Sequence, residues 1–359
     1  MLRVLLSLVL LVLVAGCAGI PRTGSPAELP TRAADAATVL APFEDRAALP
    51  AQIAGLPLPE GRAFALLVLI PAPAVVDLSD PERARRGLVQ FLNPVATYRA
   101  GTLMGHTMAG WRCADGAMGL VSKSGDDRNR GLGMVFRGWG LAAFLSEYAD
   151  GHLIEPAEMS ARHHRVLRQG RARILAVEVD EAGCQAVRRA LVAYRQHPNR
   201  PERVFTMMRD PADLGGDGCA EFALWLIGHS GALGDLPALM RREITLRDSF
   251  VGIGSMPRSP LVTPFVAQGA PDPVPLIALM TGDWSQGRAL QQIEVLDLEL
   301  LRLAFDRVAG IAAPVPARLR EDDAQARRLR EASDRWVTRF ARLHPFRHGR
   351  QQALVLMRR

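Results

Sequence analysis

The stretch Ile174–Pro198 reads ILAVEVDEAGCQAVRRALVAYRQHP and carries the clearest structural signal in the 359-residue chain. The apolar residues up to Val179 predict a buried strand, and Asp180 is a good N-cap for a helix that follows it. From residue 181 to about residue 196 apolar residues recur at helical spacing, so that one face of the expected helix carries Cys184, Val187, Leu191 and Tyr194. The stretch therefore predicts a strand that leads directly into an amphipathic helix.

Elements on both sides of this stretch extend the pattern. The run AFALLVLIPA at Ala63–Ala72 is continuously apolar and predicts a buried strand. LMGHTMAGW at Leu103–Trp111 and the segment Ala117–Ser122 flank a turn with the sequence Ala-Asp-Gly, which predicts a hairpin. A short apolar helix is expected from Cys219 to about Ile227, after a glycine-rich loop. The order hairpin, strand, helix, loop, helix predicts an α+β fold.

The N-terminus has the features of an export signal. A positive start, Met1-Leu2-Arg3, precedes an apolar run that is too short to span a membrane, which takes about 20 apolar residues. The run ends in Val-Ala-Gly before Cys17, which resembles the bacterial lipobox, whereas an ordinary cleaved signal is the alternative. The resemblance implies a signal peptide at residues 1–16, lipid attachment at Cys17, and a place in the cell envelope. Because Ala18 follows the cysteine, it further implies the outer membrane, facing the periplasm.

The rest of the chain divides by composition. Residues 17–50 are rich in Ala, Pro, Thr and Arg and predict a tether, and residues 51–234 hold the predicted strands and helices of the main domain. Residues 235–359 are expected to form a Pro/Gly-rich segment and a basic helical extension, with the helix at about 317–343. The last 47 residues contain 12 Arg and 5 acidic residues, so they carry a net charge of +7, equal to that of the whole chain.

Two interpretations of this basic helix remain open. Its Arg face either meets anionic lipid headgroups or is a solvated face of a packed helix, which is the more common case. Nucleic acid is not an expected partner, because the chain is exported and carries no recognition signature. Lys123 is the only lysine, and we attribute the bias toward arginine to genome composition rather than to chemistry.

Cys219 and His106 are the residues with the clearest chemical potential. A glycine-rich loop leads to Cys219, which is expected to open a helix whose N-terminal N–H groups favour a thiolate. His106 lies within an apolar strand, and histidine suits the role of a base that takes a proton from a thiol. The alternatives are a small buried cysteine at the start of a core helix and a histidine satisfied within the core.

These segments together resemble the circularly permuted NlpC-type hydrolases, which are relatives of papain. The resemblance is carried by GHTMAGW, by the stretch quoted first, and by GDGCAEFALWLIG, and it covers about residues 64–234. It implies a small antiparallel sheet packed on helices, with Cys219 as nucleophile and His106 as base. A third polar residue should lie on the strand after His106, where Ser122 is the nearest candidate. Members of the family often carry Asn directly before the cysteine, and this chain has Gly218 there.

Three hypotheses about function follow. The first is a thiol hydrolase, amidase or acyltransferase that acts on cell-wall peptide or on a lipid acyl group. The second is a non-catalytic lipoprotein that binds cell-wall or envelope partners on the same scaffold. The third is that the segments around His106 and Cys219 are unrelated parts of the core, which would hold if the two side chains lay far apart.

The remaining histidines and cysteines suggest no metal site and no cofactor. His163 and His164 lie among arginines without a cysteine or acid at ligand spacing, which favours a surface position. Apart from Cys17, the chain has three cysteines: Cys113, Cys184 and Cys219. Because three is an odd number, at least one of them stays unpaired within the chain. Cys113 and Cys184 can form a disulfide only if their Cα atoms come within about 7 Å.

Overall fold

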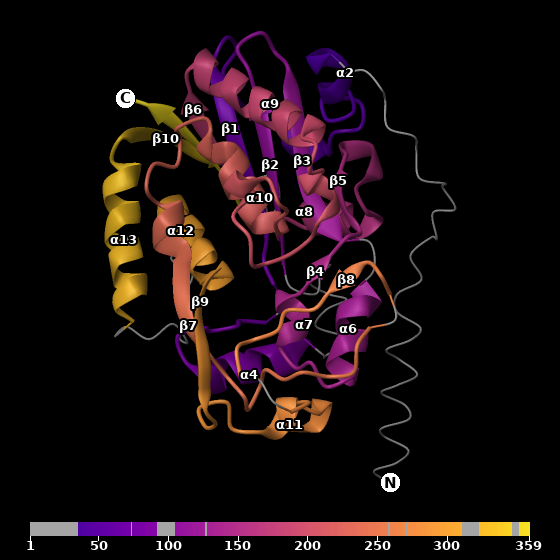
Figure 1. Cartoon of the computed structure of the whole chain (residues 1–359). Coiled ribbons are helices and arrows are strands. Elements are labelled where there is room, and N and C mark those ends of the chain that lie inside the picture. Colours follow the sequence, from indigo (N-terminus) through magenta and orange to yellow (C-terminus); the bar gives the residue numbers. More distant parts are fainter. Residues whose placement is uncertain are drawn as a thin grey trace.

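A seven-stranded sheet forms the centre of the molecule (Figure 1). The computed structural model describes residues 35–72, 74–91, 105–125, 128–257, 259–269, 272–310, 323–346 and 352–359. The strand order is β10-β11-β6-β1-β2-β3-β5, and the fold is α+β as predicted. The predicted signal peptide, Cys17 and most of the tether lie outside the described residues.

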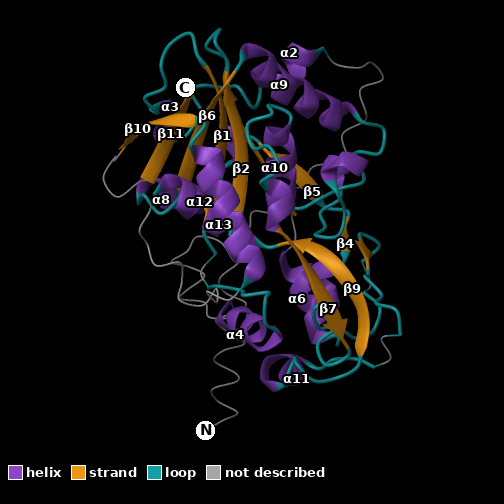
Figure 2. Cartoon of the chain, turned by 90° about the vertical axis from the view of Figure 1, so that its left-hand side faces the viewer, coloured by secondary structure: helices purple, strands orange, loops and turns teal. Residues whose placement is uncertain are grey.

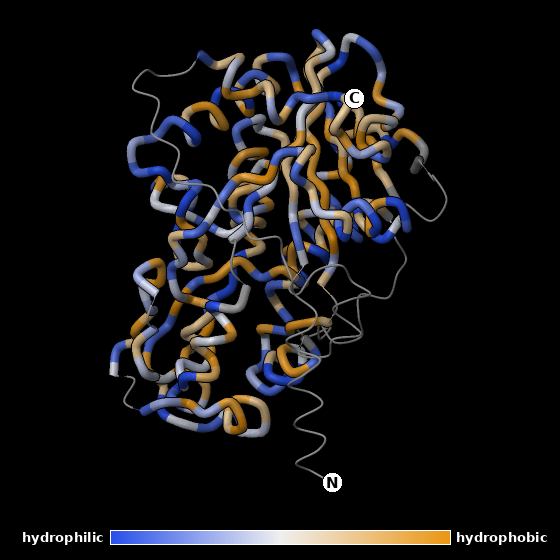
Figure 3. The backbone as a smooth tube through the Cα atoms, turned by 90° about the vertical axis from the view of Figure 1, so that its right-hand side faces the viewer, coloured by the Kyte–Doolittle hydropathy of each residue, from blue (hydrophilic) through white to orange (hydrophobic). Residues whose placement is uncertain are grey.

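The middle of the sheet consists of the predicted apolar runs. β1 (Ala63–Ile70) is buried at every position and pairs antiparallel with β2 (His106–Arg112) and with β6 (Arg173–Val179). β3 (Met118–Gly125) completes the predicted hairpin, and β5 (Gly151–Ile154) adds an edge strand. Hydrophobic stretches accordingly run along these strands (Figure 3). The apolar runs predict these strands because a strand that is buried on both faces carries apolar side chains at nearly every position.

The C-terminus belongs to the same sheet, which the sequence analysis did not predict. α13 (Ala324–Val337) ends earlier than expected, and β10 (Phe340–Phe346) and β11 (Gln352–Arg358) follow it. β11 pairs parallel with β6, from Gln352 opposite Arg173 to Leu356 opposite Val177. The predicted division at residue 234 therefore does not separate two folding units, since the sheet needs strands from both sides of it.

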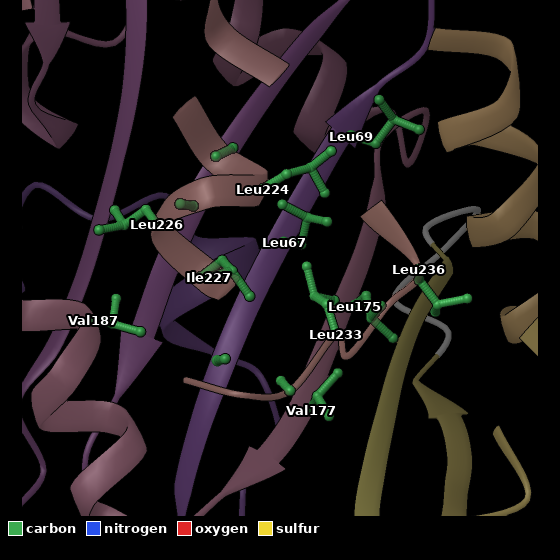
Figure 4. Close-up of a cluster of buried hydrophobic side chains, with 14 of the residues drawn as sticks. Leu67, Leu69, Leu175, Val177, Val187, Leu224, Leu226, Ile227, Leu233 and Leu236 are labelled. Carbon is green, nitrogen blue, oxygen red and sulfur yellow. The ribbon is translucent and has the colours of Figure 1, made fainter. Parts of the chain in front are cut away.

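Helices cover the two faces of the sheet. One face packs against α9 (Glu181–Gln196) and α10 (Cys219–Gly228), and Figure 4 shows side chains of both helices beside β1 and β6. The other face packs against α3 (Ala51–Ala54) and α8 (Ala161–Arg168). Because side chains alternate along a strand, β1 sends Leu67 and Leu69 to the first face and Val68 and Ile70 to the second. We call these the α10 face and the α8 face.

The predicted tether is shorter than expected. α2 (Ala36–Leu40) begins at the N-cap Asp35, and Leu40 and Phe43 are buried in the core of the α10 face. The carboxylate of Glu44 accepts hydrogen bonds from Trp111 on β2 and from Arg188 on α9. Residues 35–50 are therefore part of the folded domain.

A second lobe lies beside the sheet and has its own core (Figure 2). Its longest strands are β7 (Arg241–Arg247) and β9 (Ala289–Leu296), and β9 leads into α12 (Leu298–Ala309), which packs in the core of the α10 face. The lobe also contains α4 (Pro81–Phe91), α6 (Arg128–Phe136), α7 (Ala142–Leu145), α11 (Leu276–Thr281), β4 (Glu147–Tyr148) and β8 (Val262–Thr263). Short 3-10 turns occur at Pro156–Glu158, Pro201–Arg203, Pro211–Asp213 and Pro237–Met240.

One disulfide joins β2 to α9. Cys113 and Cys184 are bonded, with their Cα atoms 5.6 Å apart, and Cys219 is free. Within the described part of the chain, no helix has the length and apolar character to cross a membrane.

Candidate functional site

Cys219 opens α10, as the sequence predicts. Gly218 is the N-cap, and its N–H donates to the carboxylate of Glu221 at 3.3 Å, so Glu221 closes the first turn of the helix. α10 packs on β2 through Phe222, Ala223 and Leu226. The helix therefore fixes the thiol at the edge of the α10 face.

A buried ionic network holds the loop before Cys219. Nζ of Lys123 lies 2.7 Å from a carboxylate oxygen of Asp217, and it donates to the Tyr194 hydroxyl at 2.6 Å and to the Pro201 carbonyl at 2.8 Å. The Tyr194 hydroxyl donates in turn to Asp217 at 3.0 Å. Lys123 and Asp217 are both fully buried. The network ties β3, α9 and the loop together.

This network gives the only lysine of the chain a specific role. A compact ammonium with three donors satisfies three acceptors in a closed space, whereas a planar guanidinium is larger and carries five donors. Burial lowers the pKa of Lys123 and raises the pKa of Asp217, and the attraction between the two groups opposes both shifts. Lys123 therefore has a specific structural role, which the sequence interpretation did not include.

The thiol of Cys219 lies among backbone donors. The N–H groups of Thr107, Ala220 and Cys219 itself favour the thiolate, while burial and the nearby carboxylate of Glu221 disfavour it. Burial dominates and raises the pKa of Cys219 to about 11. The group is therefore a protonated thiol at neutral pH.

His106 and Ser122 do form a pair, as the strand positions predict. Nε2 of His106 lies 2.9 Å from Oγ of Ser122, and both side chains are buried. The His106 ring also stacks on the ring of His163 from α8, with their centroids 4.6 Å apart. The predicted surface position of His163 is accordingly wrong, because its side chain is only 5% exposed.

The pair lies on the opposite face of the sheet from Cys219. His106 is paired with Ile70 and stacks on α8, so its ring points to the α8 face. The next residue, Thr107, is paired with Leu69 on the α10 face, and its N–H contacts the thiol. The ring of His106 thus contacts Ser122 and His163, whereas the thiol of Cys219 contacts the N–H of the next residue, and the alternation along the strand directs the histidine ring to the α8 face.

Glu221 is a functional candidate that the sequence analysis missed. Together with Asp210, Trp225, His229 and Arg241 it lines a cavity of about 460 Å³ beside α10. Burial raises the pKa of Glu221 to about 8. In the sequence this glutamate stands three positions after an N-cap, and that position predicts a capping role rather than a chemical one.

A metal centre has little support among the residues that the structure describes. One group there, Cys113 with Asp115 and Glu181, brings three potential ligand atoms close together. The sulfur of Cys113 is bonded to Cys184, so this group lacks one of its ligands.

The chain matches no family model, and comparisons with curated proteins and with solved structures find no similar protein.

Proposed function

We propose that this chain is a lipid-anchored protein of the bacterial cell envelope whose globular domain binds an envelope partner without cleaving it. The scaffold we propose is that of the circularly permuted NlpC-type hydrolases, with the sheet and α10 retained and the catalytic pair absent. The observation that carries the proposal is that the His106 ring contacts Ser122 and His163 on the α8 face, while the Cys219 thiol lies at the start of the helix that covers the α10 face and contacts the N–H of Thr107.

Two features support this proposal. The thiol has a raised pKa, so it is a poor nucleophile at neutral pH. The Cys113–Cys184 disulfide is a bond that persists in oxidising compartments, which agrees with an address outside the cytoplasm. The proposed anchor is the lipid on Cys17, and the proposed partners are cell-wall peptide or lipid.

A thiol hydrolase is the second candidate, and one observation favours it. Three backbone N–H groups lie near the sulfur, and such donors stabilise the oxyanion that forms during acyl transfer. For catalysis a base would have to reach the thiol. The His106 ring instead contacts Ser122 and His163.

Thiol labelling separates the two candidates. Cys219 is the free thiol of the described residues, and Cys17 is blocked if it carries lipid, so iodoacetamide reports on one site. The binding function predicts slow labelling at pH 7 that rises only in strongly alkaline solution and is the same in His106→Ala. Ser122→Ala serves as the matched control for any change in packing on the α8 face. Rapid labelling at pH 7 that falls at least tenfold in His106→Ala would establish the hydrolase instead.

A further inference from the structure

A largely apolar cavity, partly open to solvent, lies in the second lobe, away from Cys219. Its volume is about 340 Å³, which falls within the range of small-molecule binding sites. Apolar side chains from α4, α7, β9 and the loops around them form most of its wall: Leu88, Phe144, Leu145, Phe250, Trp284 and Val295. Protein interiors are otherwise close-packed, so an apolar space of this size needs an explanation.

Hydrogen bonds join α4 to α11 and to Trp284 at one side of the cavity. The carboxylate of Glu82 on α4 accepts from the N–H of Trp284 at 2.7 Å, and Arg85 donates to the carbonyl of Met280 at 2.6 Å. The indole N–H of Trp284 donates to the carbonyl of Leu279. These bonds fix α4 against α11 and orient Trp284, so the space does not depend on loosely held side chains.

One polar group in the wall has an unmet acceptor. Glu299, in the first turn of α12, is 5% exposed, and its Oε2 accepts no hydrogen bond. The nearest guanidinium nitrogen, from Arg302, is 4.0 Å away. Other carboxylates near Glu299 each have a close arginine: Asp77 with Arg83 at 2.8 Å, Asp297 with Arg242 at 2.7 Å, and Asp306 with Arg173 at 3.0 Å.

We propose that this cavity binds a single-chain lipid whose head group is uncharged and donates a hydrogen bond. The apolar wall accommodates the chain, and the free acceptor of Glu299 matches a hydroxyl or amide donor. Two more charged residues line the cavity: Glu243, which is exposed, and Arg247, whose guanidinium donates to the Gly287 carbonyl at 2.9 Å. The carboxylates of Glu243 and Glu299 outnumber this one cation and disfavour an anionic head group. This inference rests on the proposed binding function and names its ligand.

The test uses the full-length chain held in amphipol, so that no detergent competes for the site. N-phenyl-1-naphthylamine, an apolar fluorophore with one N–H donor, is titrated into the protein, and dodecanol and dodecanoate are compared as competitors. We expect saturable binding of one probe per chain and at least tenfold stronger displacement by dodecanol than by dodecanoate. Absence of saturable binding, or equal displacement by the two competitors, would overturn the proposal.

Variants locate the binding in the cavity. Ala84→Phe and Leu88→Trp place new side-chain volume in the cavity from α4, and each is expected to weaken probe binding at least tenfold. Two such variants are used because either one alone could fail to fold, which circular dichroism detects. A folded variant that binds the probe as the native chain does would place the binding elsewhere and contradict the proposal.

The role of Glu299 has its own control. Glu299→Leu should retain probe binding but lose most of the preference for dodecanol, whereas Glu294→Leu, at an exposed carboxylate on β9, should change neither. An unchanged preference in Glu299→Leu would remove Glu299 from the site. If the probe does not bind while Cys219 stays unreactive, the ligand assignment fails but the binding function stands. If the probe binds and Cys219 proves reactive, the ligand assignment stands but the proposed binding function fails.

Discussion

Buried carboxylates in two parts of the molecule differ in how closely their hydrogen-bonding and charged partners approach them. Beside the central sheet, one oxygen of Asp217 lies 2.7 Å from the ammonium of Lys123, and the other accepts a hydrogen bond from Tyr194. In the wall of the apolar cavity, Oε2 of Glu299 on α12 accepts no hydrogen bond and lies 4.0 Å from the guanidinium of Arg302. The first arrangement offsets part of the desolvation cost of two buried charges and fixes a backbone loop, whereas the second leaves an interaction for a ligand to make.

The strongest test of this comparison is removal of the ammonium from the matched network. Lys123→Met should lower the free energy of unfolding by about 3–5 kcal/mol, because it leaves Asp217 buried without its counter-ion. Denaturant unfolding followed by circular dichroism measures the loss.

A double variant checks the cause of that loss. Lys123→Met combined with Asp217→Leu removes both charges, so it should be less destabilised than the sum of the two single variants. Additive losses would mean that the network contributes through shape alone. In that case the contrast between Asp217 and Glu299 would have no electrostatic basis.

Removal of the disulfide on the same face should cause the next largest loss of stability. Cys113 and Cys184 are separated by 71 residues in sequence, so their bond restricts the unfolded chain strongly. Cys113→Ala with Cys184→Ala should lower the free energy of unfolding by about 2–4 kcal/mol. Unfolding of the native chain with and without dithiothreitol should reproduce the difference, and stability that does not respond to reduction would contradict it.

Much of the central sheet could be predicted, because its apolar runs are long and their turns are explicit. Residues 63–70, 106–112 and 173–179 form strands where the sequence places them, and the helix after Asp180 begins at Glu181 and ends at Gln196. The C-terminal strands were missed, because Phe340 continues the apolar spacing of α13 and partners in a parallel pair lie far apart in sequence.

The candidate site could be predicted only in part. Position along the chain places Cys219 at a helix start and pairs His106 with Ser122, and the structure has both features. Which face of the sheet a strand residue points to depends on the register, and a shift of one position exchanges the faces. Thr107 rather than His106 faces α10, and no local pattern in GHTMAGW distinguishes the two.

A smaller effect is expected at Glu221, which combines burial with a helix-capping role. Its pKa is raised from 4.5 to about 8, so the folded chain holds this proton more tightly than the unfolded chain does. Stability should therefore be highest below pH 4.5 and should fall as the pH rises toward 8.

Glu221→Gln tests this pH dependence. The Gln side chain stays neutral and can still accept from the Gly218 N–H, although more weakly than a carboxylate. The variant should be more stable than the native chain by about 1–3 kcal/mol at pH 8 and nearly equal to it at pH 4. Equal stability at both pH values would show that the carboxyl is solvated.

The smallest effect is expected at Cys219 itself. The residue as a whole is of intermediate exposure although its sulfur is buried, and the N–H groups of Thr107 and Ala220 that lie near the sulfur can also donate to a serine hydroxyl. Cys219→Ser should therefore change the free energy of unfolding by less than about 1 kcal/mol, which is far less than the change expected at Lys123. A loss above about 2 kcal/mol would mean that the sulfur is a core group of the α10 face. That result would leave the slow labelling of Cys219 explained by poor access rather than by the missing base.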